Sequence, residues 1–67
     1  MSYSVEITLK LNGEYVPNSD IHIGTYNSYE TAQRVAEAID VQDADLYECY
    51  IYTLDENYEI LETTRIF

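Results

Sequence analysis

The most constraining feature of this 67-residue sequence is a stretch of strict alternation near its start. From Tyr3 to Leu11, apolar or aromatic residues occupy every odd position and polar residues every even position. Successive side chains of a strand point to opposite faces, so this period predicts a strand that buries one face. Asn12-Gly13 follows at once and suits a two-residue type I′ turn, which needs positive φ at both positions. The chain is therefore expected to begin with a β-hairpin.

The returning strand of this hairpin is expected to be an interrupted edge strand. It starts at residues 14–16, and Pro17 then lacks the backbone N–H that a central strand would donate to its neighbour. We expect the strand to break at residues 17–19 and to resume at residues 21–23.

A helix is predicted next. Asn27 or Ser28 can cap its N-terminus, and Glu30 is placed to cap back or to interact favourably with the helix dipole. The helix is expected to end near Asp40. Its apolar residues form one narrow stripe that can lie on a sheet: Tyr29, Ala32, Val35, Ala36 and Ile39.

Two more extended segments, 46–54 and 58–67, are separated by the turn-forming residues 55–57. The predicted order is ββαββ. An antiparallel sheet of about four strands with the helix packed on one face buries these apolar faces most simply. The sequence thus predicts a small α+β domain of two layers that spans residues 1–67. Its core is expected to combine residues of the first strand and the helix: Val5, Ile7, Leu9, Val35 and Ile39.

The segment 46–54 is apolar or aromatic on both faces. We assign Cys49 and Ile51 to the core, which places Tyr50 and Tyr52 on the outer face. These tyrosines have two interpretations. They either pack across the outer sheet face on neighbours such as Tyr58, or they form a contact surface, since tyrosine is enriched in binding hot spots.

Catalysis is not expected, because nucleophilic catalysis needs a nucleophile and a base within hydrogen-bond reach. The sequence has a single histidine, His22, and a single cysteine, Cys49. His22 is expected to point outward from an edge strand, and Cys49 is expected to act as a small buried hydrophobic residue. We predict that the chain is not an enzyme and needs no cofactor.

A metal site is not expected either. Asp40, Asp43, Asp45 and Glu48 bring oxygen ligands close together in the sequence. The glycine that an EF-hand loop needs at its sixth position is missing, and so are the ligand spacings. A solvated acidic turn is the expected structure of this segment.

The charge is strongly negative, with 13 acids against 3 Lys and Arg residues and a net charge of -10. This charge excludes nucleic acid as a direct partner and disfavours an anionic membrane surface. No apolar run approaches the roughly 18 residues that span a bilayer. One cysteine precludes an intramolecular disulfide, and the N-terminus lacks a signal-peptide pattern, so a soluble cytoplasmic protein is expected.

This charge exceeds the magnitude of about 2–8 that keeps a small domain soluble, and its self-repulsion costs stability. A strongly basic surface is the expected partner, and such surfaces belong mainly to proteins that bind nucleic acid. In size and charge the chain resembles small acidic inhibitors carried by phages and mobile elements, which block restriction enzymes, CRISPR nucleases or uracil-DNA glycosylases. This resemblance implies a DNA mimic of the anti-restriction or anti-CRISPR type.

The segment from Asp40 to Glu62 holds eight carboxylates and four tyrosines without a Lys or Arg. We expect its acids to form one negative field around its tyrosines and to bind a basic protein. The alternative is a generic interaction or homodimerising domain whose acidity serves solubility. The predicted partner-binding residues are Asp43, Asp45, Glu48, Tyr50, Tyr52, Asp55, Glu56, Tyr58, Glu59 and Glu62.

Overall fold

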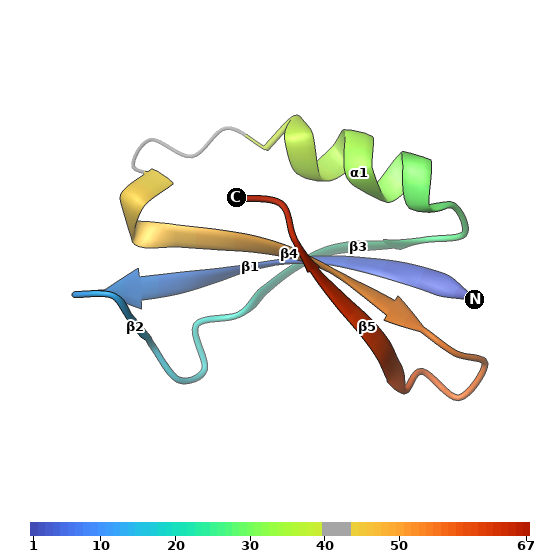
Figure 1. Ribbon diagram of the computed structural model, residues 1–67, viewed down its shortest axis with the longest axis horizontal. Helices are drawn as coiled ribbons and strands as arrows, with labels where there is room; N and C mark the ends of the chain where they lie inside the picture. Colours follow the sequence, from blue (N-terminus) through green and yellow to red (C-terminus); the bar gives the residue numbers. More distant parts are fainter. Residues whose placement is uncertain (40–43) are drawn as a thin grey trace.

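An antiparallel sheet with an α-helix over one of its faces makes up the structure (Figure 1). The computed structural model describes residues 1–39 and 44–67. The elements are β1 (Ser2–Leu11), β2 (Glu14–Tyr15), β3 (Ile21–Tyr26), α1 (Tyr29–Glu37), the 3-10 helix η1 (Ala44–Leu46), β4 (Tyr47–Leu54) and β5 (Ile60–Arg65). The predicted α+β fold of two layers is confirmed.

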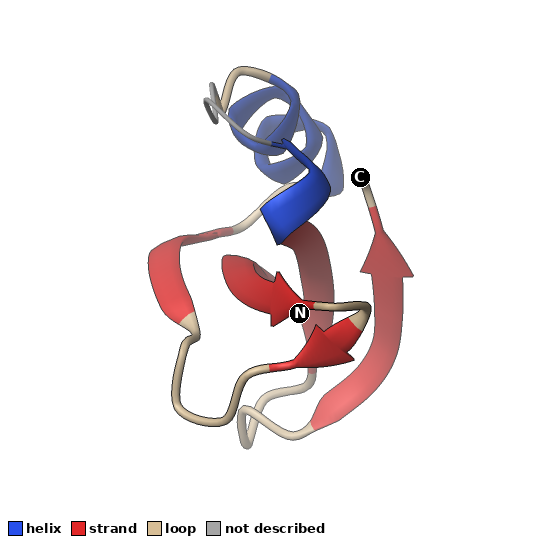
Figure 2. Ribbon diagram, turned by 90° about the vertical axis from the view of Figure 1, so that its left-hand side faces the viewer, coloured by secondary structure: helices blue, strands red, loops and turns tan. Residues whose placement is uncertain are grey.

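Strand β1 lies in the middle of the sheet. Along one edge it pairs antiparallel with β4, from Ser2 opposite Leu54 to Leu9 opposite Tyr47. Its other edge pairs first with β3 and then with β2, so these two short strands form one interrupted edge. Strand β5 lies beside β4 at the opposite edge. Figure 2 shows that the sheet is curled, with α1 lying over one side.

The first hairpin turn has the backbone that its sequence predicts. Asn12 and Gly13 both have positive φ, 54° and 80°. The break after β2 has a clear hydrogen-bond cause. The Ser19 hydroxyl accepts from the Leu9 N–H at 3.1 Å and donates to the Val16 carbonyl at 2.6 Å. One side chain therefore stands between two backbone groups that a continuous strand would join directly.

Helix α1 is shorter than the sequence predicts. Ser28 is its N-cap, and the Ser28 Oγ accepts from the Thr31 N–H at 3.5 Å. The helix ends at Glu37, with Ala38 as C-cap, whereas the predicted end near Asp40 lies outside the described residues.

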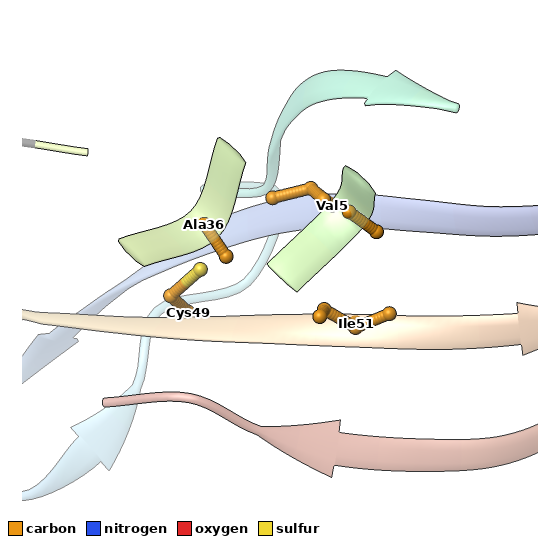
Figure 3. Close-up of a cluster of buried hydrophobic side chains, with 5 residues drawn as sticks. Val5, Ala36, Cys49 and Ile51 are labelled. Atoms are coloured by element: carbon orange, nitrogen blue, oxygen red, sulfur yellow. The ribbon is translucent and has the colours of Figure 1, made fainter. Parts of the chain in front are cut away.

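The core lies between α1 and the middle of the sheet, and it contains smaller side chains than predicted. Val5, Ala32, Ala36, Cys49 and Ile51 are fully buried. Figure 3 shows the side chains of Ala36 and Cys49 pointing toward one another from α1 and β4. Burial raises the pKa of the Cys49 thiol, which favours its neutral form. The predicted role of Cys49 as a buried hydrophobic residue is confirmed.

The predicted core is confirmed only in part at its ends. Ile39 is half-buried and packs against the core, whereas Val35 and Leu9 are half-buried outside it. Leu11, the next inward residue of β1, is 50% exposed. A nine-residue helix is about 14 Å long, whereas a ten-residue strand such as β1 extends about 33 Å. The inward row of β1 therefore runs beyond the part of the sheet that α1 can cover.

The helix covers β1, β3 and β4, and no close approach of α1 to β5 occurs within residues 1–39 and 44–67. Tyr3 and Tyr29 extend the core toward one end with an edge-to-face contact, their ring centroids 5.7 Å apart. Within the described ranges no helix has both the length and the apolar character needed to cross a membrane.

Candidate functional site

Strand β4 places Glu48, Tyr50 and Tyr52 together on the sheet face opposite the helix. The alternation of the strand requires this arrangement, because Cys49 and Ile51 point into the core. The Tyr50 and Tyr52 rings stack with centroids 6.2 Å apart and planes 16° apart. They pack on each other and not on Tyr58, which the cross-strand interpretation had named as a neighbour.

Glu48 is the best-partnered acid of this face. Its Oε1 accepts from the Tyr50 hydroxyl at 2.7 Å. Its Oε2 lies 3.4 Å from the Lys10 Nζ and 2.9 Å from the Arg65 Nη2. The Tyr50 hydrogen bond, with smaller contributions from the two cations, holds the pKa of Glu48 below its usual range. Sequence reasoning missed Lys10 and Arg65, because only the strand register brings them to Glu48.

This arrangement concentrates the positive charge of the chain at one point. Two of the three Lys and Arg residues bind a single carboxylate. The twelve other acids in the sequence are left with Arg34 as the remaining Lys or Arg residue. The negative surplus of the protein therefore lies away from Glu48.

Replacing Tyr50 with phenylalanine should raise the pKa of Glu48, because the change removes the hydroxyl that stabilises the carboxylate. Glu48 stabilises the fold above its ordinary pKa of 4.5, and this contribution is lost as pH falls through the lowered pKa. In Tyr50→Phe the folded and unfolded pKa values of Glu48 lie closer together, so the variant should lose less stability than the wild type as the pH falls below 4.5. NMR titration of the Glu48 side chain, with urea unfolding at each pH, measures both effects.

The control is Tyr52→Phe, which removes a hydroxyl from the same face without touching Glu48. An identical Glu48 titration in the wild type and Tyr50→Phe would contradict the assigned role of the Tyr50 hydroxyl.

The β4–β5 turn holds a second group of predicted site residues. The Asp55 Oδ1 accepts from the Asn57 N–H at 2.8 Å and from the Glu59 N–H at 3.0 Å. The Asp55 carbonyl accepts from the Tyr58 N–H at 3.0 Å. Asp55 therefore closes the turn, while Glu56 and Glu59 are exposed.

Tyr58 stands at this turn in an unfavourable conformation. Its φ is 62°, in the left-handed region that glycine adopts most easily, and its side chain is 73% exposed. A three-residue hairpin loop commonly needs a left-handed residue here. Tyr58 therefore places an exposed aromatic ring at a backbone position where glycine would be more stable.

Replacing Tyr58 with glycine should therefore stabilise the protein by about 0.5–1 kcal/mol, since relief of the left-handed strain outweighs the added entropy of the unfolded chain. Urea unfolding measures the change. Asn57→Gly is the matched control, because Asn57 has no positive φ and should gain nothing. A Tyr58→Gly variant no more stable than the wild type would show that the turn does not strain this residue.

The predicted single negative field is divided in the structure. Asp45 lies in η1 before β4, and Asp55 and Glu56 follow the other end of that strand (Figure 1). Eight strand residues separate these ends by about 26 Å. Asp43 lies outside the described residues. The predicted site residues thus form an outer-face cluster and a separate acidic hairpin. The outer-face cluster is Glu48, Tyr50 and Tyr52, and the acidic hairpin is Asp55, Glu56, Tyr58, Glu59 and Glu62.

The helix side of β5 carries a groove beside the acidic hairpin. Glu62 lies opposite Thr53 and therefore on the helix side of the sheet. Helix α1 covers β1, β3 and β4 but does not extend over β5, so this part of the face is open. The groove has a volume of about 590 Å³, and its walls include Tyr3, Tyr29, Leu61 and Glu62. Leu61 is 55% exposed. An apolar surface is therefore continuous with the acids of the hairpin.

The two residues considered for catalysis lie on opposite faces of the sheet. Cys49 faces α1, whereas His22 lies opposite Glu6 on the outer face, with its Nδ1 3.1 Å from the Ser4 Oγ. In the described part of the chain, no three His, Cys, Asp or Glu side chains come together in a group able to hold a metal.

Comparisons with protein-family models, with curated proteins and with solved structures found no match. The function must therefore be inferred from the geometry and charge of the chain alone.

Proposed function

We propose that the protein is a small acidic inhibitor that occupies the basic nucleic-acid-binding surface of a nuclease or another DNA- or RNA-binding protein. It would act as a DNA mimic, in the manner of anti-restriction or anti-CRISPR proteins of phages. The observation that supports this proposal best is the acidic hairpin, which combines exposed acids with exposed apolar and aromatic side chains.

The charge of the hairpin is suited to a basic partner. Glu56, Glu59 and Glu62 are all exposed, and no Lys or Arg occurs between Tyr47 and Thr64 in the sequence. The ion pairs of Lys10 and Arg65 end on Glu48, in the outer-face cluster. Such a field attracts a positive surface and speeds association.

The apolar side chains supply short-range affinity to the same surface. Tyr58 is 73% exposed, Ile60 59% and Leu61 55%. Exposed apolar residues that lie together commonly mark interaction sites, and aromatic residues dominate binding hot spots. The position of Tyr58 at a strained residue of the turn is consistent with retention for binding at a cost in stability.

The first experiment identifies a partner and tests the mechanism. The immobilised protein captures proteins from a lysate at low salt, and a purified captured protein is then assayed for binding to labelled duplex DNA or RNA. We expect the partner to be a nucleic-acid-binding protein that leaves the column at raised salt and loses its nucleic acid when this chain is added. A partner that binds this chain and its nucleic acid together would overturn the proposal.

Matched variants locate the surface. Glu56→Gln with Glu59→Gln removes two charges from the acidic hairpin, and Glu30→Gln with Glu37→Gln removes two from the exposed face of α1. The hairpin pair should weaken displacement of the nucleic acid, whereas the helix pair should leave it nearly unchanged. Equal effects would show that net charge alone, and not the hairpin, determines binding.

A homodimerising domain is the second candidate, and the edge position of β5 favours it. Among the described residues, β5 is an edge strand that pairs with β4 on one side only. The unpaired side of an edge strand can pair with another chain. Each copy carries a charge of -10, so self-association should strengthen as salt rises. Binding to a basic partner should instead weaken as salt rises, because salt screens the attraction between opposite charges. Sedimentation at low and high salt distinguishes the two candidates.

A further inference from the structure

A hollow of about 380 Å³ lies on the outer face of the sheet, apart from the acidic hairpin. Its lining comes from strands at both edges of the sheet and from the segment that precedes β3. Thr8 is part of this lining and is only 4% exposed, so the hollow reaches down to the sheet itself. The remaining lining residues are Tyr15, Asp20, Glu48, Tyr50, Tyr52 and Thr63.

Asp20 supplies negative charge to this hollow without a cation of its own. Its two carboxylate oxygens accept from the Tyr15 hydroxyl at 3.2 and 3.1 Å. The ion pairs found within residues 1–39 and 44–67 both end on Glu48, which leaves Asp20 and Glu6 without one. Burial raises the pKa of Tyr52, and the negative charges of Glu6 and Asp20 raise it further, so both acids act on this tyrosine.

We propose that this hollow binds the guanidinium group of an arginine side chain. A guanidinium is flat and positively charged, so it can stack on a tyrosine ring while its N–H groups bind a carboxylate. The hollow offers tyrosine side chains and the Asp20 carboxylate together. The identity of the donor rests on the proposed function, since arginine is a principal phosphate-binding residue of nucleic-acid-binding proteins.

The outer face already binds one arginine through a carboxylate. Arg65 lies opposite Tyr50 in the β4–β5 register, and its Nη2 is 2.9 Å from the Glu48 Oε2. The Glu48 end of the hollow is thus occupied by the chain's own cations. An entering guanidinium is therefore directed to Asp20.

The test uses Nα-acetyl-arginine methylamide and its uncharged analogue, Nα-acetyl-citrulline methylamide, titrated into the isotopically labelled protein. We expect saturable NMR shifts at the amides of Thr8, Tyr52 and Thr63 with the arginine compound. The citrulline compound has a similar shape without the charge and should bind at least about fivefold more weakly. Equal shifts with both compounds would overturn the proposal.

Two variants test the role of the carboxylate. Asp20→Asn should weaken arginine binding about fivefold, while Glu37→Gln, the same type of change on α1, should leave it unchanged. Tyr15→Phe keeps the ring and removes the hydroxyl that occupies Asp20, so it should bind arginine at least as tightly as the wild type. Unchanged binding in Asp20→Asn, with the rest of the spectrum preserved, would also overturn the proposal.

This test is independent of the partner. Arginine binding in the hollow with no nucleic-acid-binding partner would support the hollow and refute the proposed function. If this protein displaces nucleic acid from a partner but its hollow does not bind arginine, the proposed function would be supported and the arginine site refuted.

Discussion

Replacing Ile51 with alanine is expected to leave most of the protein unfolded at room temperature. Ile51 is fully buried at the centre of the core, and such a change typically costs about 2–5 kcal/mol. A domain of this size has only about 3–5 kcal/mol of net stability. The core is also built from small residues, so few neighbouring side chains can fill the cavity. Circular dichroism and urea unfolding measure the loss.

Ile60→Ala is the matched control. The chemical change is the same, but Ile60 is 59% exposed, so the free energy of unfolding should change by no more than about 0.5 kcal/mol. If Ile51→Ala unfolds at the same urea concentration as the wild type, Ile51 cannot be the centre of the core.

Reversing two charges of the acidic hairpin should have the largest effect on binding. Glu56→Lys with Glu59→Lys is expected to slow association with a basic partner by about tenfold or more and to flatten its salt dependence. Tyr58→Ala should act differently and mainly speed dissociation, because it removes contact area from the same hairpin and leaves the charge unchanged. Surface plasmon resonance at several salt concentrations separates the two rates.

The control for this prediction is Glu30→Lys with Glu37→Lys on the exposed face of α1, which changes the net charge equally. Its association rate should fall much less than that of the hairpin variant. Binding that survives reversal of Glu56 and Glu59 unchanged would exclude charge mimicry by the hairpin and favour the generic interaction domain.

The sequence predicted those parts of the fold that local chemistry decides. Asn12-Gly13 can adopt the positive φ values of a tight turn, and Pro17 cannot continue a ladder, so both hairpin features follow from a few adjacent residues. The faces of β4 also follow from alternation once Cys49 and Ile51 are taken as core. The length of α1 was overestimated, because a stripe of apolar residues continues past the point where the helix ends.

The site was less predictable, because it depends on how distant strands are aligned. Lys10 and Arg65 come to Glu48 only through the pairing of β1 and β5 with β4. The acids that are neighbours in the sequence were expected to act together, but β4 separates Asp45 from Asp55 along its full length. Asp20 drew no attention in the sequence, since nothing local relates it to the tyrosines of β4.

The position of β1 in the middle of the sheet also determines how the chain reaches its fold. Ser2 pairs with Leu54, and Leu9 with Tyr47, so the two central strands come from opposite ends of the chain. The hairpins at residues 12–13 and 55–59 can form quickly and independently, since each closes a short loop. Joining β1 to β4 requires closure of a loop that spans at least residues 10–46, more than half of the chain, which is entropically costly. Folding is therefore expected to be slow for so small a protein, with the β1–β4 encounter as its rate-limiting step.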